Sequence, residues 1–259
     1  MWSSVVRGVT LHFRLTAINN QNFVMEDVET GTWWQQVTGE ALQGPLTGER
    51  LRGIRFQEIA FGIWGTEYPD TIVMLPEDER TDRYLGADWE QEVQGLPLPA
   101  ALRPLGDLQG RDIVVGLVVQ GRAIAYPLDT IAAQTPIADQ VGTTALLVAC
   151  AADGRSVRVF DRRVNGRVLD LYARPESEPP VFIDVQTGSE WNFAGLATSG
   201  PMIGSELEPL AATKDFWFDW HNHHPDTRVY TAGGLPAGRG GPTGPAETEP
   251  ALGSPPGAR

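Results

Sequence analysis

The chain has 259 residues, of which 41% are hydrophobic and 20% charged, a balance typical of globular proteins that bury a core. Asp and Glu number 33 against 20 Lys and Arg, so the net charge is −13, which argues against a surface for nucleic acid or anionic membranes. The longest apolar run, Ala145 to Ala152, is far shorter than the ~20 residues of a membrane-spanning helix, so no span is predicted.

Composition divides the chain into four parts. Residues 1–75 are predicted to form a first lobe and residues 113–232 a second lobe. Residues 76–112, charged at first and then rich in Gly and Pro, are predicted to link the two lobes. Residues 233–259 hold 8 Gly and 6 Pro and no aromatic residue, so this tail is predicted to be disordered.

The two lobes share a repeated sequence, which predicts an internal duplication. The repeat begins near Val24 in the first lobe and near Val181 in the second. Identical pairs include Thr30/Thr187, Gly31/Gly188, Trp34/Trp191, Gly44/Gly200, Pro45/Pro201, Trp64/Trp220 and the Pro-Asp-Thr triplets 69–71/225–227. Residues 113–163 have no counterpart before Gly8, so we expect an incomplete first lobe. Either this lobe has fewer strands or the chain begins partway through a copy, and we favour truncation because half a sheet would expose its edge strands.

Short β-type runs dominate the second lobe. Residues 113–119 and 122–126 are apolar and flank Gln120-Gly121, which predicts a β-hairpin. Runs at 145–149, 157–160 and 168–172 predict further strands, and Asn165-Gly166 predicts a tight turn. Helices are predicted at 127–138 and 211–222. The expected fold is therefore mainly β with a few short helices, in two homologous lobes of which the first is incomplete.

A histidine cluster is the densest group of candidate ligand-binding residues. His221, His223 and His224 are three imidazoles in four residues, and imidazole suits zinc and copper. Neighbouring side chains rarely converge on one metal, however, and the matched positions in the first lobe are Gly65, Glu67 and Tyr68. The pattern is better explained by a helix end with histidines at its negative pole and a proline stop, and no metal site is predicted.

Three further sets of residues are candidates for chemistry or binding. Cys150 is a thiol candidate, although a lone cysteine after an apolar run is usually a core residue. Asp70 and Asp226 lie at equivalent positions and form a candidate acid–base pair, but an Asp after Pro commonly caps a turn. Trp34 and Trp191 recur at matched positions, which indicates either core anchors or a platform that stacks on a carbohydrate.

Several motifs together resemble the bacterial family known as domain of unknown function 3179. They are Gly121–Leu128, Phe160–Arg167, Asp184–Trp191, Gly200-Pro201, and Trp220 with His224–Thr227. The resemblance implies a tandem duplication with an upstream C-P-x-C-G motif, and an exported, extracytoplasmic protein. At the matching position the second lobe reads Cys150-Ala151-Ala152-Asp153-Gly154, with a single cysteine. The resemblance implies no established activity and no cofactor.

Two functions are left open by the sequence. The favoured hypothesis is a β-rich binding or scaffold protein for a protein or small-molecule ligand, because the repeated residues are Gly, Pro, Trp and turn Asp. The alternative is a metal- or thiol-dependent extracytoplasmic enzyme whose site lies largely upstream. A further expectation is that another chain completes the first lobe.

Overall fold

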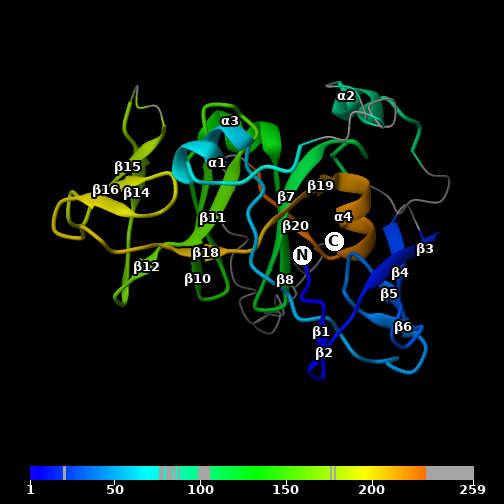
Figure 1. Cartoon of the computed structure of the whole chain (residues 1–259). Helices are drawn as coiled ribbons and strands as arrows, with labels where there is room; N and C mark the ends of the chain where they lie inside the picture. The colour runs from blue at the N-terminus through cyan, green and yellow to red at the C-terminus, as the bar shows by residue number, and fades with distance from the viewer. Residues whose placement is uncertain are drawn as a thin grey trace, which may run out of the picture.

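The computed structural model describes residues 1–19, 22–75, 79, 84, 86, 88–98, 106–175, 177 and 179–231. Within these residues the fold is mainly β, with four four-stranded sheets, two two-stranded hairpins and four short helices (Figure 1). This confirms the predicted mainly β fold with a few short helices, whereas the two homologous lobes stay a prediction. The predicted tail at 233–259 and parts of the predicted linker lie outside the described residues, and the domain boundaries stay predictions.

The N-terminal lobe is a small antiparallel meander. Arg7 and Gly8, at φ 49° and 81°, turn the chain between the first two strands. Trp34 is fully buried at the centre of a core formed with Val6, Leu11, Ala41 and Leu51. The strands are β1 (Val5–Val6), β2 (Val9–Thr10), β3 (Phe13–Asn19), β4 (Asn22–Asp27), β5 (Trp33–Gln35) and β6 (Ala41–Gln43).

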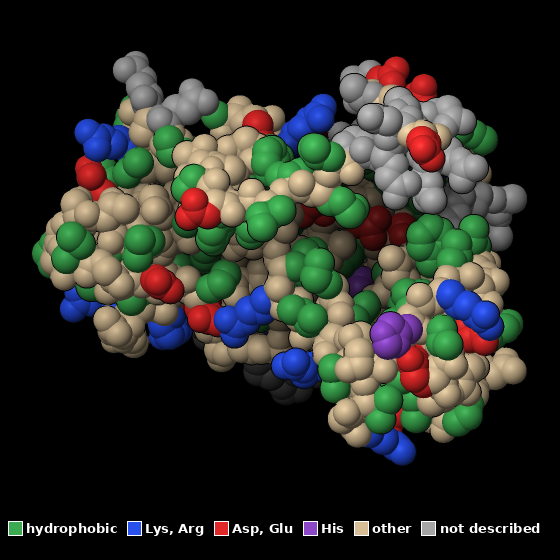
Figure 2. Space-filling model, viewed as in Figure 1, with side chains coloured by type: hydrophobic (Ala, Val, Ile, Leu, Met, Phe, Trp, Pro, Cys, Tyr) green, Lys and Arg blue, Asp and Glu red, His purple; other side chains and the backbone are tan. Residues whose placement is uncertain are grey.

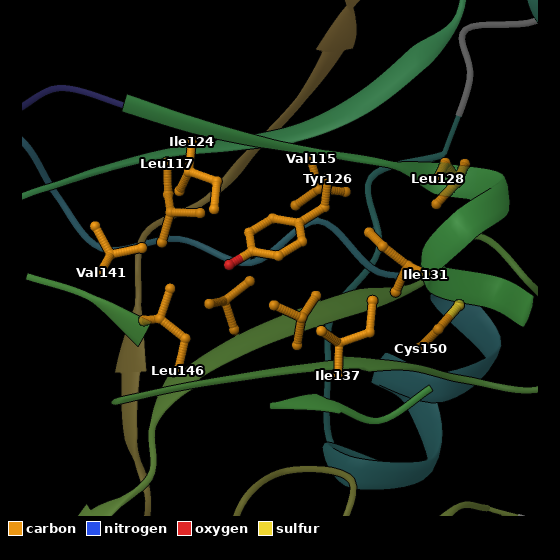
Figure 3. Packing of buried hydrophobic residues seen from close by; sticks show 12 residues of the cluster. Val115, Leu117, Ile124, Tyr126, Leu128, Ile131, Ile137, Val141, Leu146 and Cys150 are labelled. Atoms are coloured by element: carbon orange, nitrogen blue, oxygen red, sulfur yellow. The ribbon is translucent and has the colours of Figure 1, made fainter. Parts of the chain in front are cut away.

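Two four-stranded sheets form the centre of the second lobe. Their strand orders are β19-β7-β8-β20 and β18-β11-β10-β9. Tyr126 lies between them, surrounded by aliphatic side chains of both sheets and of helix α3 (Figure 3). The elements are β7 (Ile113–Val119), β8 (Arg122–Pro127), α3 (Leu128–Gln134), β9 (Ile137–Val141), β10 (Thr144–Cys150), β11 (Val157–Asp161), β18 (Glu208–Leu210), β19 (Thr213–Phe216), α4 (Trp217–His223) and β20 (Arg228–Val229). The predicted hairpin is confirmed: Gln120 and Gly121 take φ 51° and 73°, as a two-residue turn between twisted strands requires.

A second meander packs on the outer face of β10 and β11. Trp191 is fully buried there with Phe160, Phe182 and Leu147. The predicted tight turn at Asn165-Gly166 is confirmed, with φ 49° and 78°. The predicted strand at 168–172 is divided, because Leu169 and Asp170 lie between β13 and β14. The strands are β12 (Arg163–Val164), β13 (Arg167–Val168), β14 (Leu171–Ala173), β15 (Val181–Asp184), β16 (Glu190–Asn192) and β17 (Ala197–Ser199).

The two meanders make the same hydrogen bonds at matched positions. Asp27 accepts the indole N–H of Trp34 at 2.8 Å and the hydroxyl of Thr30 at 2.8 Å. Asp184 accepts the indole N–H of Trp191 at 2.9 Å and the hydroxyl of Thr187 at 2.8 Å. Because these bonds hold both carboxylates in their charged form, the pKa of each is lowered despite burial. At these positions the two meanders are thus alike in hydrogen bonding as well as in sequence.

Both predicted helices are shorter than expected, and each gives way to a strand. Helix α3 ends at Gln134, because Pro136 has no N–H to donate and disfavours helical geometry in the residue before it. Residues Ile137 and Val141 then alternate into the core as part of β9. The segment Thr213–Phe216 pairs antiparallel with β7, so α4 begins only at Trp217. Strand pairing thus replaces the helix predicted from local spacing.

Helix α1 (Phe61–Glu67) connects the N-terminal lobe to the second lobe. Arg158 of β11 is almost fully buried and binds both carboxylate oxygens of Glu67, each at 2.6 Å. The amide oxygen of Gln57 accepts the Nε–H of Arg158 at 2.9 Å. A fourth helix, α2 (Trp89–Gln94), lies within the predicted linker.

Gly116 allows α4 to pack directly on β7, and we expect substitution there to be costly. A Cβ at this position would lie 2.5 Å from the indole ring of Trp220, so Gly116→Ala should lower the free energy of unfolding by about 2 kcal/mol. Gly62→Ala in α1 is the matched control, because its Cβ meets nothing within 4 Å and alanine favours a helix. Urea denaturation of both variants measures the difference. Equal stability of the two variants would contradict this packing.

Candidate functional site

The sequence Trp220–Thr227 builds a short helix end followed by a sharp turn. His224 adopts φ −130° and ψ 67°, and its backbone N–H donates to the carbonyl of Trp220 at 2.9 Å. The indole N–H of Trp220 donates to the hydroxyl of Thr227 at 3.0 Å. Pro225 has no N–H with which to continue the helix. The histidines therefore lie at the negative end of a helix, as their spacing predicts.

Two histidines and one aspartate of the predicted set meet in a groove of about 600 Å³. His223, His224 and Asp226 form one side of this groove. The β7–β8 and β9–β10 hairpins form the other side, and their contributions include Gly121, Arg122, Gln140 and Gly142. Arg228 of β20 also lines the groove. His221 is not among the residues that line the groove, and its ring stacks on Trp217 with 4.7 Å between centroids.

A chain of hydrogen bonds holds Arg228, one of the residues that line the groove. The Tyr126 hydroxyl donates to Asp139 Oδ2 at 2.7 Å, and Arg228 Nη2 donates to the same oxygen at 2.5 Å. Burial and the neighbouring Asp139 raise the pKa of Tyr126, so its hydroxyl stays protonated. Burial, with smaller effects of His223 and Arg50, lowers the pKa of His224. At neutral pH the His224 imidazole is therefore uncharged and has one donor and one acceptor nitrogen.

An acidic cleft lies between α4 and the N-terminal lobe. Asn22 Nδ2 donates to Asp219 Oδ1 at 2.5 Å and lies 3.1 Å from His223 Nε2. Nearby, burial followed by the charges of Asp219 and Glu58 raises the pKa of Asp215 to about 7. Figure 2 shows a hollow beside the lobe of β3–β6, at the place of α4 in Figure 1, with acidic side chains and a histidine inside it. His223 thus contacts the cleft and also lines the groove.

A family model described as protein of unknown function (DUF3179) matches residues 2–227, which is most of the chain. The chain belongs to the DUF3179 family. The comparisons with curated proteins and with solved structures gave no match. No helix among the described residues of this DUF3179 chain is both long and apolar enough to cross a membrane.

Cys150 of the DUF3179 chain lies in the core, at the end of β10. Its side chain packs among the residues between the two central sheets, where its sulfur is visible in Figure 3. Burial and the nearby Asp153 raise the pKa of the thiol to about 11, so it stays protonated at neutral pH. A protonated, buried thiol is a poor nucleophile. Within the described residues no group of three or more His, Cys, Asp and Glu side chains could hold a metal ion.

The remaining predicted residues of the DUF3179 chain do not join the groove. Trp34 and Trp191 are fully buried, which makes them core anchors and leaves no face for stacking on a carbohydrate. Asp70 lies in an exposed turn after α1 and is not among the residues that line the groove with Asp226.

Several groove residues were missed by sequence reasoning. Arg122, Gln140 and Arg228 come from separate strands, and only strand pairing brings them beside His224. The Gln120-Gly121 turn was the one local signal, because it places Arg122 at a hairpin tip. Asp139 and Asp215 lie in short mixed segments with no motif around them.

Proposed function

We propose that this DUF3179 chain is a binding protein and that the groove beside His224 is its binding site for a small polar ligand with an anionic group. The observation that carries the proposal is convergence: side chains from the α4 turn, two hairpins and β20 meet in one groove. Its volume, about 600 Å³, is in the range of small-molecule sites.

The guanidinium group of Arg122 favours an anionic group on the ligand. Arg122 and Arg228 bring two guanidinium groups to the groove and Asp226 one carboxylate, and Arg122 is exposed at the hairpin tip. The carboxylate of Asp139 is already bonded to Tyr126 and Arg228. A guanidinium group binds a carboxylate through two parallel hydrogen bonds, so Arg122 is the natural anchor.

Calorimetric titration with succinate, glutamate and inorganic phosphate tests this proposal. We expect saturable binding of at least one of these anions and an affinity about tenfold lower in Arg122→Gln, because one guanidinium–carboxylate contact is lost. Arg167→Gln is the matched control, because Arg167 is exposed on β13, outside the groove. Absence of saturable binding, or equal affinity in Arg122→Gln, would show that the groove is not the site.

The structure also bears on two other hypotheses from the sequence, a tandem duplication and a thiol-dependent enzyme. The shared hydrogen bonds of Asp27 and Asp184 support a tandem duplication in which one lobe has acquired the groove. The matched turn of the first lobe, at Tyr68-Pro69-Asp70, is followed by a segment, Thr71–Leu75, that pairs with no strand among the described residues. A thiol-dependent enzyme receives no support from Cys150, whose thiol is buried in the core.

A further inference from the structure

Helix α1 and helix α4 begin two structural units that are alike in detail. The indole N–H of Trp64 donates to the Thr71 hydroxyl at 2.8 Å, as that of Trp220 donates to Thr227 at 3.0 Å. Tyr68 and His224 end the two helices with nearly the same backbone angles, φ −130° with ψ 71° and 67°. Each end residue also packs its ring on the tryptophan, at 4.3 and 4.2 Å between centroids. The two units are therefore built to pack in the same way.

The two helices differ in how far their matched aromatic side chains are buried. Trp217 and Trp220 of α4 are 3% and 6% exposed, whereas the matched Phe61 and Trp64 of α1 are 62% and 37% exposed. After the turn, Val229 of β20 is half-buried. By contrast, Ile72–Leu75 is an exposed run of four apolar residues, with Ile72 96% and Met74 94% exposed. Apolar patches of this kind on a soluble protein mark interaction surfaces.

The β7–β8 hairpin is what covers the second unit. Trp217 and Trp220 pack on Val114 of β7 and Ala125 of β8. Gly116 lies directly beneath the Trp220 ring. Strand β20 then pairs parallel to β8, with Val229 opposite Ala125. One antiparallel hairpin thus buries the helix face and also pairs with the strand that follows it.

We propose that α1 and Ile72–Leu75 form a docking surface for an antiparallel β-hairpin of a partner polypeptide, similar in design to β7–β8. The hairpin adds its second strand parallel to Ile72–Leu75, with Val73 at the position of Val229. Its first strand carries a glycine beneath Trp64, because that ring occupies the place of Trp220. A second copy of this chain fits less well, since pairing Ile72–Leu75 with itself would leave Phe61 and Trp64 uncovered.

The probe is a synthetic peptide with the sequence of residues 111–128, which contains the hairpin that covers α4. Hydrogen exchange of the full chain is measured with and without the peptide. We expect exchange to slow at the amide of Met74, because it matches Tyr230, whose N–H donates to the carbonyl of Ala125 at 2.8 Å. The control peptide carries Gly116→Val, which places a bulky side chain against the tryptophan ring, and it should bind at least tenfold more weakly.

Variants of the chain separate docking from loss of folding. Met74→Asp changes a side chain that is exposed, so folding is retained while peptide binding falls at least tenfold. Ile203→Asp, at another exposed apolar residue, should bind the peptide like the parent chain. Equal protection by both peptides, or no protection at the Met74 amide, would overturn the proposal. A dimer in sedimentation velocity that Met74→Asp abolishes would overturn it in favour of a second copy.

Discussion

Replacing Glu67 with alanine should lower the free energy of unfolding by about 3 kcal/mol, because it leaves a buried charge without its partner. Arg158 is 3% exposed, and both of its terminal nitrogens bind Glu67 at 2.6 Å. Without Glu67 the guanidinium keeps the amide oxygen of Gln57 and the ring of Phe193, which lies 4.7 Å from it. Urea denaturation measures the loss.

Two further variants show whether the buried charge is the cause. Arg158→Met combined with Glu67→Leu removes both charges and should recover most of the lost stability, since an apolar pair avoids the desolvation of two ions. Arg174→Ala breaks the exposed pair with Glu190 and should cost less than about 1 kcal/mol. A double variant no more stable than Glu67→Ala would show that α1 is held by other contacts.

Asp215→Asn should stabilise the protein at pH 8 by up to about 4 kcal/mol, with no effect near pH 4. Burial, and then the charges of Asp219 and Glu58, raise the pKa of Asp215 to about 7 in the folded state. In the unfolded chain the pKa is near its ordinary value of about 3.9. Between these pH values the folded protein holds a proton that the unfolded chain has lost, so stability falls as pH rises through the window. Asparagine has no proton to lose, and its Oδ1 still accepts the Phe216 N–H that Asp215 accepts at 2.8 Å.

The measurement is urea denaturation of the parent chain and of Asp215→Asn at half-unit intervals from pH 4 to pH 8. Asp107→Asn is the control, because Asp107 is exposed in a turn and its replacement should leave the pH profile unchanged. Parallel profiles for the parent chain and Asp215→Asn would contradict a half-buried carboxyl at Asp215 that binds a proton in the folded state.

Local patterns were sufficient for the fold wherever turn chemistry and alternation act over a few residues. Gln120-Gly121 and Asn165-Gly166 marked hairpins because only a few residue types tolerate the positive φ that these turns need. Local spacing predicted a helix across Thr213–Phe216, but this segment is a strand. Its partner strand, β7, lies about a hundred residues earlier in the sequence. Pairing across that distance depends on tertiary packing, which no local window contains.

The candidate site divides in the same way. His223, His224 and Asp226 are neighbours in sequence, so the sequence alone was sufficient to predict them as candidate binding residues. Arg122, Asp139 and Arg228 are dispersed, and the groove exists only because β20 pairs with β8 and β9 pairs with β10. For the tryptophans, residue type alone left two interpretations open. Trp34 and Trp191 could have formed a binding platform or core anchors, and in the structure both are fully buried in the core.

The most direct test of groove binding is where an anion perturbs the folded chain. Amide chemical shifts are recorded while succinate is added, with sodium chloride at equal ionic strength as the control. We predict saturable shifts at Gly121, Arg122, Gly142 and Arg228, which line the groove, and none at Gly166 in the β12–β13 turn. Shifts that are absent, or that gather instead at Asn22 and Asp219 in the acidic cleft, would contradict the proposed site.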